Sequence, residues 1–164
     1  MTDYNEKLGI SVNVTLPKVP CHILSLDVVD TTGVHLVDVG GLVHKHRLSV
    51  SGEILGSETA FDNHDDNSNQ QLVFEEAKAA MEAKEGCNLE GTVIVNKVPG
   101  NFHISGHANG QAIQMLYQIG KPLDFTHTVH KLEFGDPEEQ KEVVALDPTF
   151  VQVLTEPVKI NGNT

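Results

Sequence analysis

Residues 91–105 constrain the fold of this chain more than any other stretch of its sequence. Two runs of strand-forming residues, rich in Val, Ile and Thr, are separated by Pro99-Gly100, a pair typical of turns. In the second run, Phe102 and Ile104 alternate with polar neighbours, as in a half-buried strand. The stretch therefore predicts two successive β-strands joined by a tight connection.

Most of the remaining chain carries the same signal, because apolar and polar residues alternate in short runs bounded by turn residues. Residues 57–71 are rich in Asn, Asp and Ser and predict a loop, and 113–117 fit either a strand or a short helix. Strands are expected over 8–16, 22–29, 34–39, 42–50, 89–98, 101–106 and 125–134, with weaker ones over 150–154 and 158–160.

A single helix is expected over residues 72–84, where apolar residues recur at helical spacing and Gly86 provides a stop. The chain has no Trp and only 5% aromatic residues, so its core must depend on Val, Leu and Ile, which favour strands. Together these patterns predict a mainly β protein, an antiparallel β-sandwich with one short helix.

Charge and motif content exclude several functional classes. The chain has 11 basic and 23 acidic side chains, a net charge of -12 that repels nucleic acid. It contains no apolar run of about 18 residues, so nothing in this chain is expected to span a membrane. No nucleophile elbow, phosphate loop or dinucleotide fingerprint is present, and neither a catalytic residue nor a cofactor is expected.

Three stretches, in this order, resemble the luminal domain of the Erv family, also called the ERGIC family. They are residues 12–27, which contain Pro20-Cys21, residues 91–105, and residues 123–136, which end in Leu-Glu-Phe-Gly-Asp. Members of this family cycle between the endoplasmic reticulum and the Golgi in COPII vesicles. The resemblance covers about residues 10–136. It implies that residues 1–164 form one luminal β-sandwich domain, an excised piece of a longer protein that is incomplete at its C-terminal end. It also implies that the protein contacts the membrane only through anchors outside this chain.

The resemblance also implies a covalent link. The family has cysteines at the positions of Cys21 and Cys87, the only two in this sequence, and a disulfide between them is expected. In a luminal protein, the sequon Asn13-Val-Thr15 is also a candidate for glycosylation at Asn13.

Two segments are predicted to contact a partner protein. The first is the turn region formed by Val98, Pro99, Gly100, Asn101 and Phe102. The second is a dense cationic cluster that includes His44, His46 and Arg47. The histidines have ligand-like spacing, but no carboxylate or thiol motif accompanies them, so no metal site is expected.

The function that the resemblance implies is binding of protein cargo or a paralogous subunit, without bond chemistry. The expected location is the lumen of the endoplasmic reticulum, the intermediate compartment and the Golgi. An alternative is the substrate-binding module of a protein-disulfide-isomerase-like fusion whose redox site lies outside this chain. The cysteine motifs of the larger paralogue type are missing from residues 57–84, so no thiol role carries over. A third interpretation is a lipid- or carbohydrate-binding sandwich unrelated to traffic.

Overall fold

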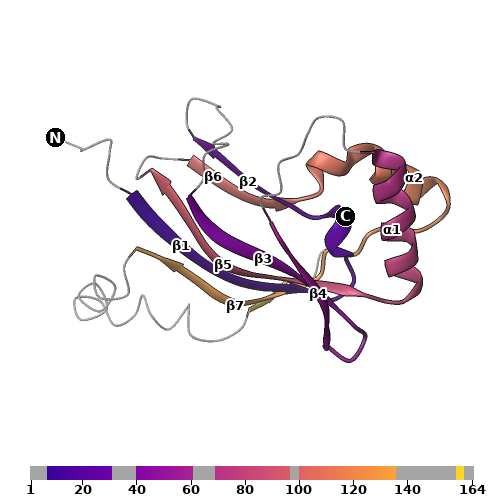
Figure 1. The fold of residues 1–164 in the computed structure, drawn as a ribbon, viewed down its shortest axis with the longest axis horizontal. Helices are drawn as coiled ribbons and strands as arrows, with labels where there is room; N and C mark the ends of the chain where they lie inside the picture. The colour runs from indigo at the N-terminus through magenta and orange to yellow at the C-terminus, as the bar shows by residue number, and fades with distance from the viewer. Residues whose placement is uncertain (1–6, 31–39, 61–68, 97–99, 136–157, 161–164) are drawn as a thin grey trace.

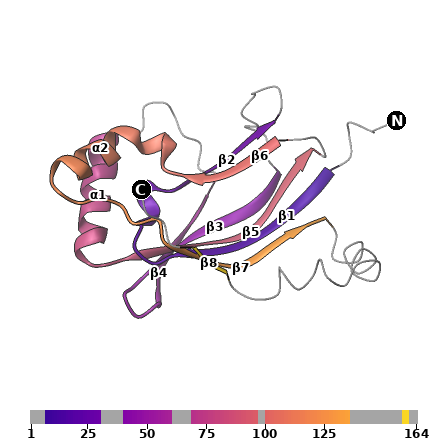
Figure 2. The ribbon, with the colours of Figure 1, turned by 180° about the vertical axis from the view of Figure 1, so that it is seen from behind.

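The structure of the protein is a computed structural model that describes residues 7–30, 40–60, 69–96, 100–135 and 158–160. These residues form two β-sheets, with two α-helices gathered at one end (Figures 1 and 2). The strands are β1 (Lys7–Leu16), β2 (Ser25–Asp30), β3 (Gly40–Leu48), β4 (Ile54–Thr59), β5 (Gly86–Asn96), β6 (Gly100–Ser105), β7 (His127–Phe134) and β8 (Val158–Ile160). This arrangement confirms the predicted mainly β, antiparallel sandwich. The strands predicted over 34–39 and 150–154 lie outside the described residues.

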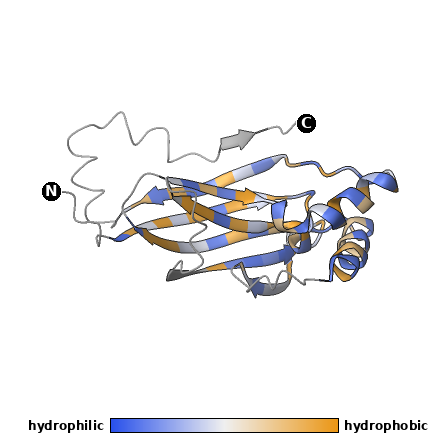
Figure 3. Cartoon of the chain, turned by 90° about the horizontal axis from the view of Figure 1, so that it is seen from above, coloured by the Kyte–Doolittle hydropathy of each residue, from blue (hydrophilic) through white to orange (hydrophobic). Residues whose placement is uncertain are grey.

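The larger sheet has six strands in the order β4-β3-β5-β1-β7-β8, and every pairing is antiparallel. Strand β1 lies inside it and pairs with β5 along its whole length, from Lys7 opposite Asn96 to Leu16 opposite Cys87. Every second residue of β1 from Ile10 to Leu16 is buried. Figure 3 shows the corresponding alternation of hydrophobic and hydrophilic residues along the strands. Since each fully buried Val or Leu side chain contributes about 1.5–3 kcal/mol, the alternation fixes which face points inward.

The smaller sheet consists of β2 and β6 and covers the apolar face of the larger one. Strands β5 and β6 are neighbours in sequence but belong to different sheets. The Pro99-Gly100 region therefore connects the two layers of the sandwich instead of closing a hairpin. Its first part, residues 97–99, lies outside the described residues.

Helix α1 (Gln70–Glu82) confirms the helix expected over 72–84 and begins at Asn69, whose side chain accepts a hydrogen bond from the amide of Leu72. The predicted stop at Gly86 is wrong. The left-handed residue after α1 is Lys84, with φ of 57°, and Gly86 is already the first residue of β5.

Two further elements differ from the sequence-based expectation. A second helix, α2 (Gly110–Gln118), packs beside α1, so the expectation of a single helix is wrong. Of the two alternatives for residues 113–117, the short helix is the one observed. Its start at glycine and its nine-residue length gave a weak helical signal. The expected loop at 57–71 overlaps β4, an edge strand whose Ile54 and Leu55 are exposed and therefore lack the buried alternation of an interior strand. Among the described residues, no helix is both long and apolar enough to cross a bilayer.

Candidate functional site: a groove between the two sheets

The two cysteines are joined in a disulfide, as the family resemblance implied. Cys21 lies in a short 3-10 turn (Cys21–Ile23) that leads into β2, and Cys87 lies in β5 of the larger sheet. Their Cα atoms are 4.9 Å apart although 66 positions separate them in sequence, and both side chains are buried. The bond thus links the entry of the smaller sheet to the start of β5, an interior strand of the larger sheet.

The predicted cationic cluster on β3 is divided between the two faces of the larger sheet, because successive residues of a strand point to opposite sides. Lys45 points inward, and its Nζ lies 3.0 Å from the Glu58 carboxylate and 3.4 Å from the carbonyl oxygen of Cys21. His44 and His46 lie on the outer face with their rings stacked at 5.9 Å. The cluster is therefore not a single cationic surface.

Arg47 is on the inward side with Lys45 and makes a bidentate ion pair with Glu85. Its Nε and one terminal nitrogen donate to the two carboxylate oxygens at 2.9 and 2.8 Å. The side chain of Glu85 is 9% exposed, while that of Arg47 is 38% exposed. The hydrogen bonds from Arg47 lower the pKa of Glu85 from its ordinary value, and the same bonds raise the pKa of Arg47. This geometry assigns Arg47 a structural role.

Replacing Arg47 with methionine is expected to lower the free energy of unfolding by about 2 kcal/mol at neutral pH, because Glu85 is left largely buried without its partner. Because the pKa of Glu85 is lowered in the folded protein, the pair stabilises the fold fully when the pH is above 4.5, the ordinary pKa of this carboxyl. The stabilisation is lost as the pH falls through the lowered pKa. The difference between wild type and variant in urea unfolding should therefore shrink below about pH 4.

The matched control for this prediction is Lys18→Met. Lys18 makes an ion pair with Asp124 at 2.7 Å, but the lysine side chain is 63% exposed. Its loss should cost much less stability than the loss of Arg47, because solvent screens surface pairs. Equal effects of the two substitutions, or a difference for Arg47→Met that persists at acid pH, would contradict the assignment.

The outer face of the larger sheet is a network of polar side chains. Asn88 donates from its amide nitrogen to Asn13 Oδ1 at 2.8 Å and to Thr15 Oγ1 at 2.9 Å, and His130 Nε2 lies 3.0 Å from the same Thr15 oxygen. Asn13 is half-buried on an interior strand. Glycosylation of Asn13 stays a prediction. The side-chain oxygen of Asn13 already accepts a hydrogen bond from Asn88.

The described part of the predicted turn contact lies at a groove between the two sheets. Two hollows of about 330 Å³ each meet there, and Phe102 of β6 and Leu132 of β7 line both of them. Gly100 and Asn101 line the first hollow together with residues of β1, β2, β5 and β7. Val129 lines the second, below β6. We call these two hollows, with the residues named here, the inter-sheet groove.

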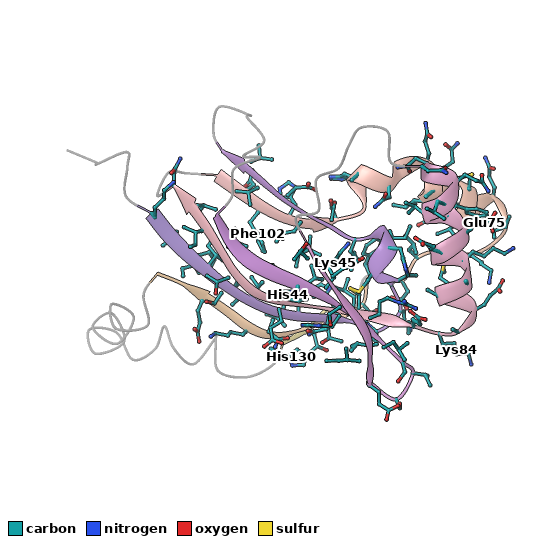
Figure 4. All side chains as sticks on the ribbon, viewed as in Figure 1. His44, Lys45, Glu75, Lys84, Phe102 and His130 are labelled. Atoms are coloured by element: carbon teal, nitrogen blue, oxygen red, sulfur yellow. A yellow bond between two sulfur atoms is a disulfide. The ribbon has the colours of Figure 1, made fainter. Side chains whose placement is uncertain are left out.

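The two halves of the predicted contact surface are therefore not brought together. Figure 4 shows Phe102 in the space between the sheets and His130 on the other side of the larger sheet, the side that also carries His44 and His46. Sequence reasoning identified Phe102 but missed Val129 and Leu132. Their loose alternation along residues 125–134 was the only available signal. Over the described residues, no group of three or more potential metal-ligating side chains comes together.

Comparison with known proteins places this chain in a family. Residues 57–161 match the family described as "Endoplasmic reticulum vesicle transporter". Residues 1–37 match a second family description, "Endoplasmic Reticulum-Golgi Intermediate Compartment (ERGIC)".

Among individual relatives, endoplasmic reticulum-Golgi intermediate compartment protein 1 of Xenopus laevis is 33% identical over 82% of this chain and 32% of its own length. The ER-derived vesicles protein ERV46 of Saccharomyces cerevisiae is 22% identical over 82% of this chain and 48% of its own length. The chain thus spans between about a third and a half of these relatives. A solved structure of Erv41p superposes with a TM-score of 0.48 and 17% identity over 82% of this chain and 59% of that one; a likeness this weak says nothing about function.

The first family match extends from β4 to β8 and so takes in β6 and β7, the strands on either side of the groove, as well as Cys87 of the disulfide. Because this match covers well over half of the sequence, the chain belongs to the endoplasmic reticulum vesicle transporter family.

Proposed function

We propose that this chain is a non-catalytic binding domain of a transport receptor that cycles between the endoplasmic reticulum and the Golgi. It would contact protein cargo or a paralogous subunit in the lumen of these compartments. The observation that carries the proposal is family membership, since the relatives have names that refer to vesicles or to the intermediate compartment. A buried disulfide is also the kind of bond that persists in an oxidising compartment.

The inter-sheet groove is the contact surface that the geometry supports best. It combines concave shape with half-buried apolar side chains such as Phe102 and Leu132, features that recur at the centre of protein interfaces. The outer face has its side chains engaged in hydrogen bonds with one another, among them Ser11 with Thr92 and His46 with Ser57. Binding there would have to compete with those bonds.

The oxidoreductase alternative has less physical support. Both cysteines of the chain are in one buried disulfide, so neither presents an accessible thiol or an exposed sulfur for exchange. Any redox chemistry would have to come from a part of the protein outside this chain. The relatives described above have transport or compartment names and lend this alternative no support.

The proposal is tested by titrating the purified protein with the purified luminal domain of a paralogue from the same genome, using isothermal calorimetry. Saturable binding is expected, and Phe102→Ser should weaken it by about tenfold or more if this ring anchors the contact. The matched control is His103→Ser, because His103 is the adjacent residue of β6, is exposed and points away from the groove. Thermal unfolding shows whether each variant remains folded.

Two results would contradict the proposal at different levels. If the wild-type protein binds neither a paralogue nor a purified vesicle cargo protein, the binding function itself is wrong. If it binds but Phe102→Ser and His103→Ser have the same affinity as wild type, the function stands and the groove is not the contact surface.

A further inference from the structure

The smaller sheet has a strand edge that no described strand covers. Strand β6 pairs with β2 along one side, from Ser105 opposite Ser25 to Gly100 opposite Asp30. On its other side, no strand pairs with it within the described ranges. An uncovered edge presents a row of backbone N–H and C=O groups that are ready to pair with another extended chain.

This edge faces the inter-sheet groove. The second hollow is lined by residues of β1, β6 and β7 and the segment before β7, including Ile104 and Val129, but by none of β2. The second hollow therefore lies on the side of β6 away from β2, above β1 and β7, whereas the first hollow is also lined by Val28 and Val29 of β2. Neighbouring strands of a sheet lie about 4.8 Å apart, and packed sheets lie about 10 Å apart. A strand added to the uncovered edge of β6 would extend the smaller sheet by one strand and would therefore lie over β7 of the larger sheet.

The groove has the chemistry of a site for an apolar strand. Phe102, Ile104, Val129 and Leu132 are all only half-buried, so the added strand would find apolar surface still exposed to water. Neither hollow is lined by Asp, Glu, Lys or Arg, and His127 is the one titratable side chain among their described linings. The uncharged groove favours a segment that is apolar in its middle. The net charge of -12 on the chain favours basic residues at the ends of that segment, outside the groove.

We propose that the inter-sheet groove binds an extended segment of another protein by strand addition to β6. Main-chain hydrogen bonds to β6 would give the affinity, and every second side chain of the segment would pack on Val129 and Leu132. This inference rests on the proposed binding function and specifies the form of the bound partner: an extended apolar segment with basic flanks.

The test uses a fluorescent ten-residue synthetic peptide of alternating Val and Thr with one Lys at each end. Two further versions have N-methyl groups on one or the other set of alternate backbone amides. In strand pairing only one set of amides faces the partner strand. One methylated peptide should therefore lose about tenfold or more in affinity by fluorescence anisotropy, because it loses several main-chain hydrogen bonds, while the other should retain binding.

Two measurements on the protein complete the experiment. Leu132→Gln should weaken binding, whereas Lys131→Gln should not, since Lys131 is an exposed neighbour that makes an ion pair with Glu133 outside the groove. Thermal unfolding verifies that both variants fold. Amide hydrogen exchange should show slowed exchange at alternate residues of Gly100–Ser105 when the peptide is bound.

Several results would overturn the inference. No saturable binding up to millimolar peptide, or equal binding of both methylated peptides and the parent, would exclude strand pairing. Protection of all β6 amides in the free monomer would show that another part of this chain covers the edge. Protection that increases with protein concentration would indicate a second copy as the occupant. In each case, binding of a paralogue or cargo through another surface would leave the proposed function intact.

Discussion

Replacing both Cys21 and Cys87 with alanine is expected to lower the free energy of unfolding by about 4 kcal/mol, the largest effect we predict for this chain. The disulfide closes a loop with a sequence separation of 66, so it removes much of the conformational freedom of the unfolded chain. A domain of this size has a total stability of about 5–15 kcal/mol, and the variant should therefore unfold at a much lower urea concentration.

A control separates the cross-link from the packing of the two sulfurs. Wild-type protein that is unfolded, reduced and refolded in reductant should have nearly the same urea midpoint as the double alanine variant. If the double variant were within about 1 kcal/mol of the oxidised wild type, the link between the two sheets would contribute little, and the unfolded state would already be restricted in another way.

Replacing Gly86 with alanine is expected to cost about 3 kcal/mol, the second largest effect. A Cβ atom at this position would lie 2.8 Å from the Cα of Pro17 and 2.9 Å from the carbonyl oxygen of Leu16. Both are backbone atoms, and Leu16 is paired with Cys87 across the β1–β5 ladder, so neither can move without disturbing the sheet next to the disulfide.

The matched control is Gly56→Ala in β4, where an added Cβ would meet no atom within 4 Å. This substitution should leave the stability unchanged or raise it by about 0.5 kcal/mol through reduced freedom of the unfolded chain. Urea unfolding of both variants measures the difference. Equal stability of the two variants would show that Pro17 can move away and that the close approach at Gly86 is not a constraint.

Some elements could be predicted from the sequence because local pattern and tertiary environment agree. Strand β1 alternates between half-buried and buried residues from Gly9 to Leu16, and α1 has apolar residues at helical spacing, so both were expected within two residues of their observed bounds. The disulfide was expected from family resemblance, not from spacing, because two cysteines alone do not indicate whether they pair.

Other features depend on contacts between distant segments and could not be predicted in this way. The sequence indicates that β5 and β6 are strands, but not that they enter different sheets. Strand alternation alone places Lys45 and His46 on opposite faces of β3, but which of the two faces inward depends on how the two sheets pack. The groove depends on β7 lying beside β1, with a register shift near Val14 that no local signal marks.

We propose that the face of the sandwich between β6 and β7, and not the polar outer face of the larger sheet, recognises the partner protein. Amide hydrogen exchange on the complex with a paralogous luminal domain tests it most directly. Slowed exchange in Gly100–Ser105 and in the Leu132 region, with no change over His44–Leu48, is the predicted result. Slowed exchange over His44–Leu48, with β6 unchanged, would contradict it.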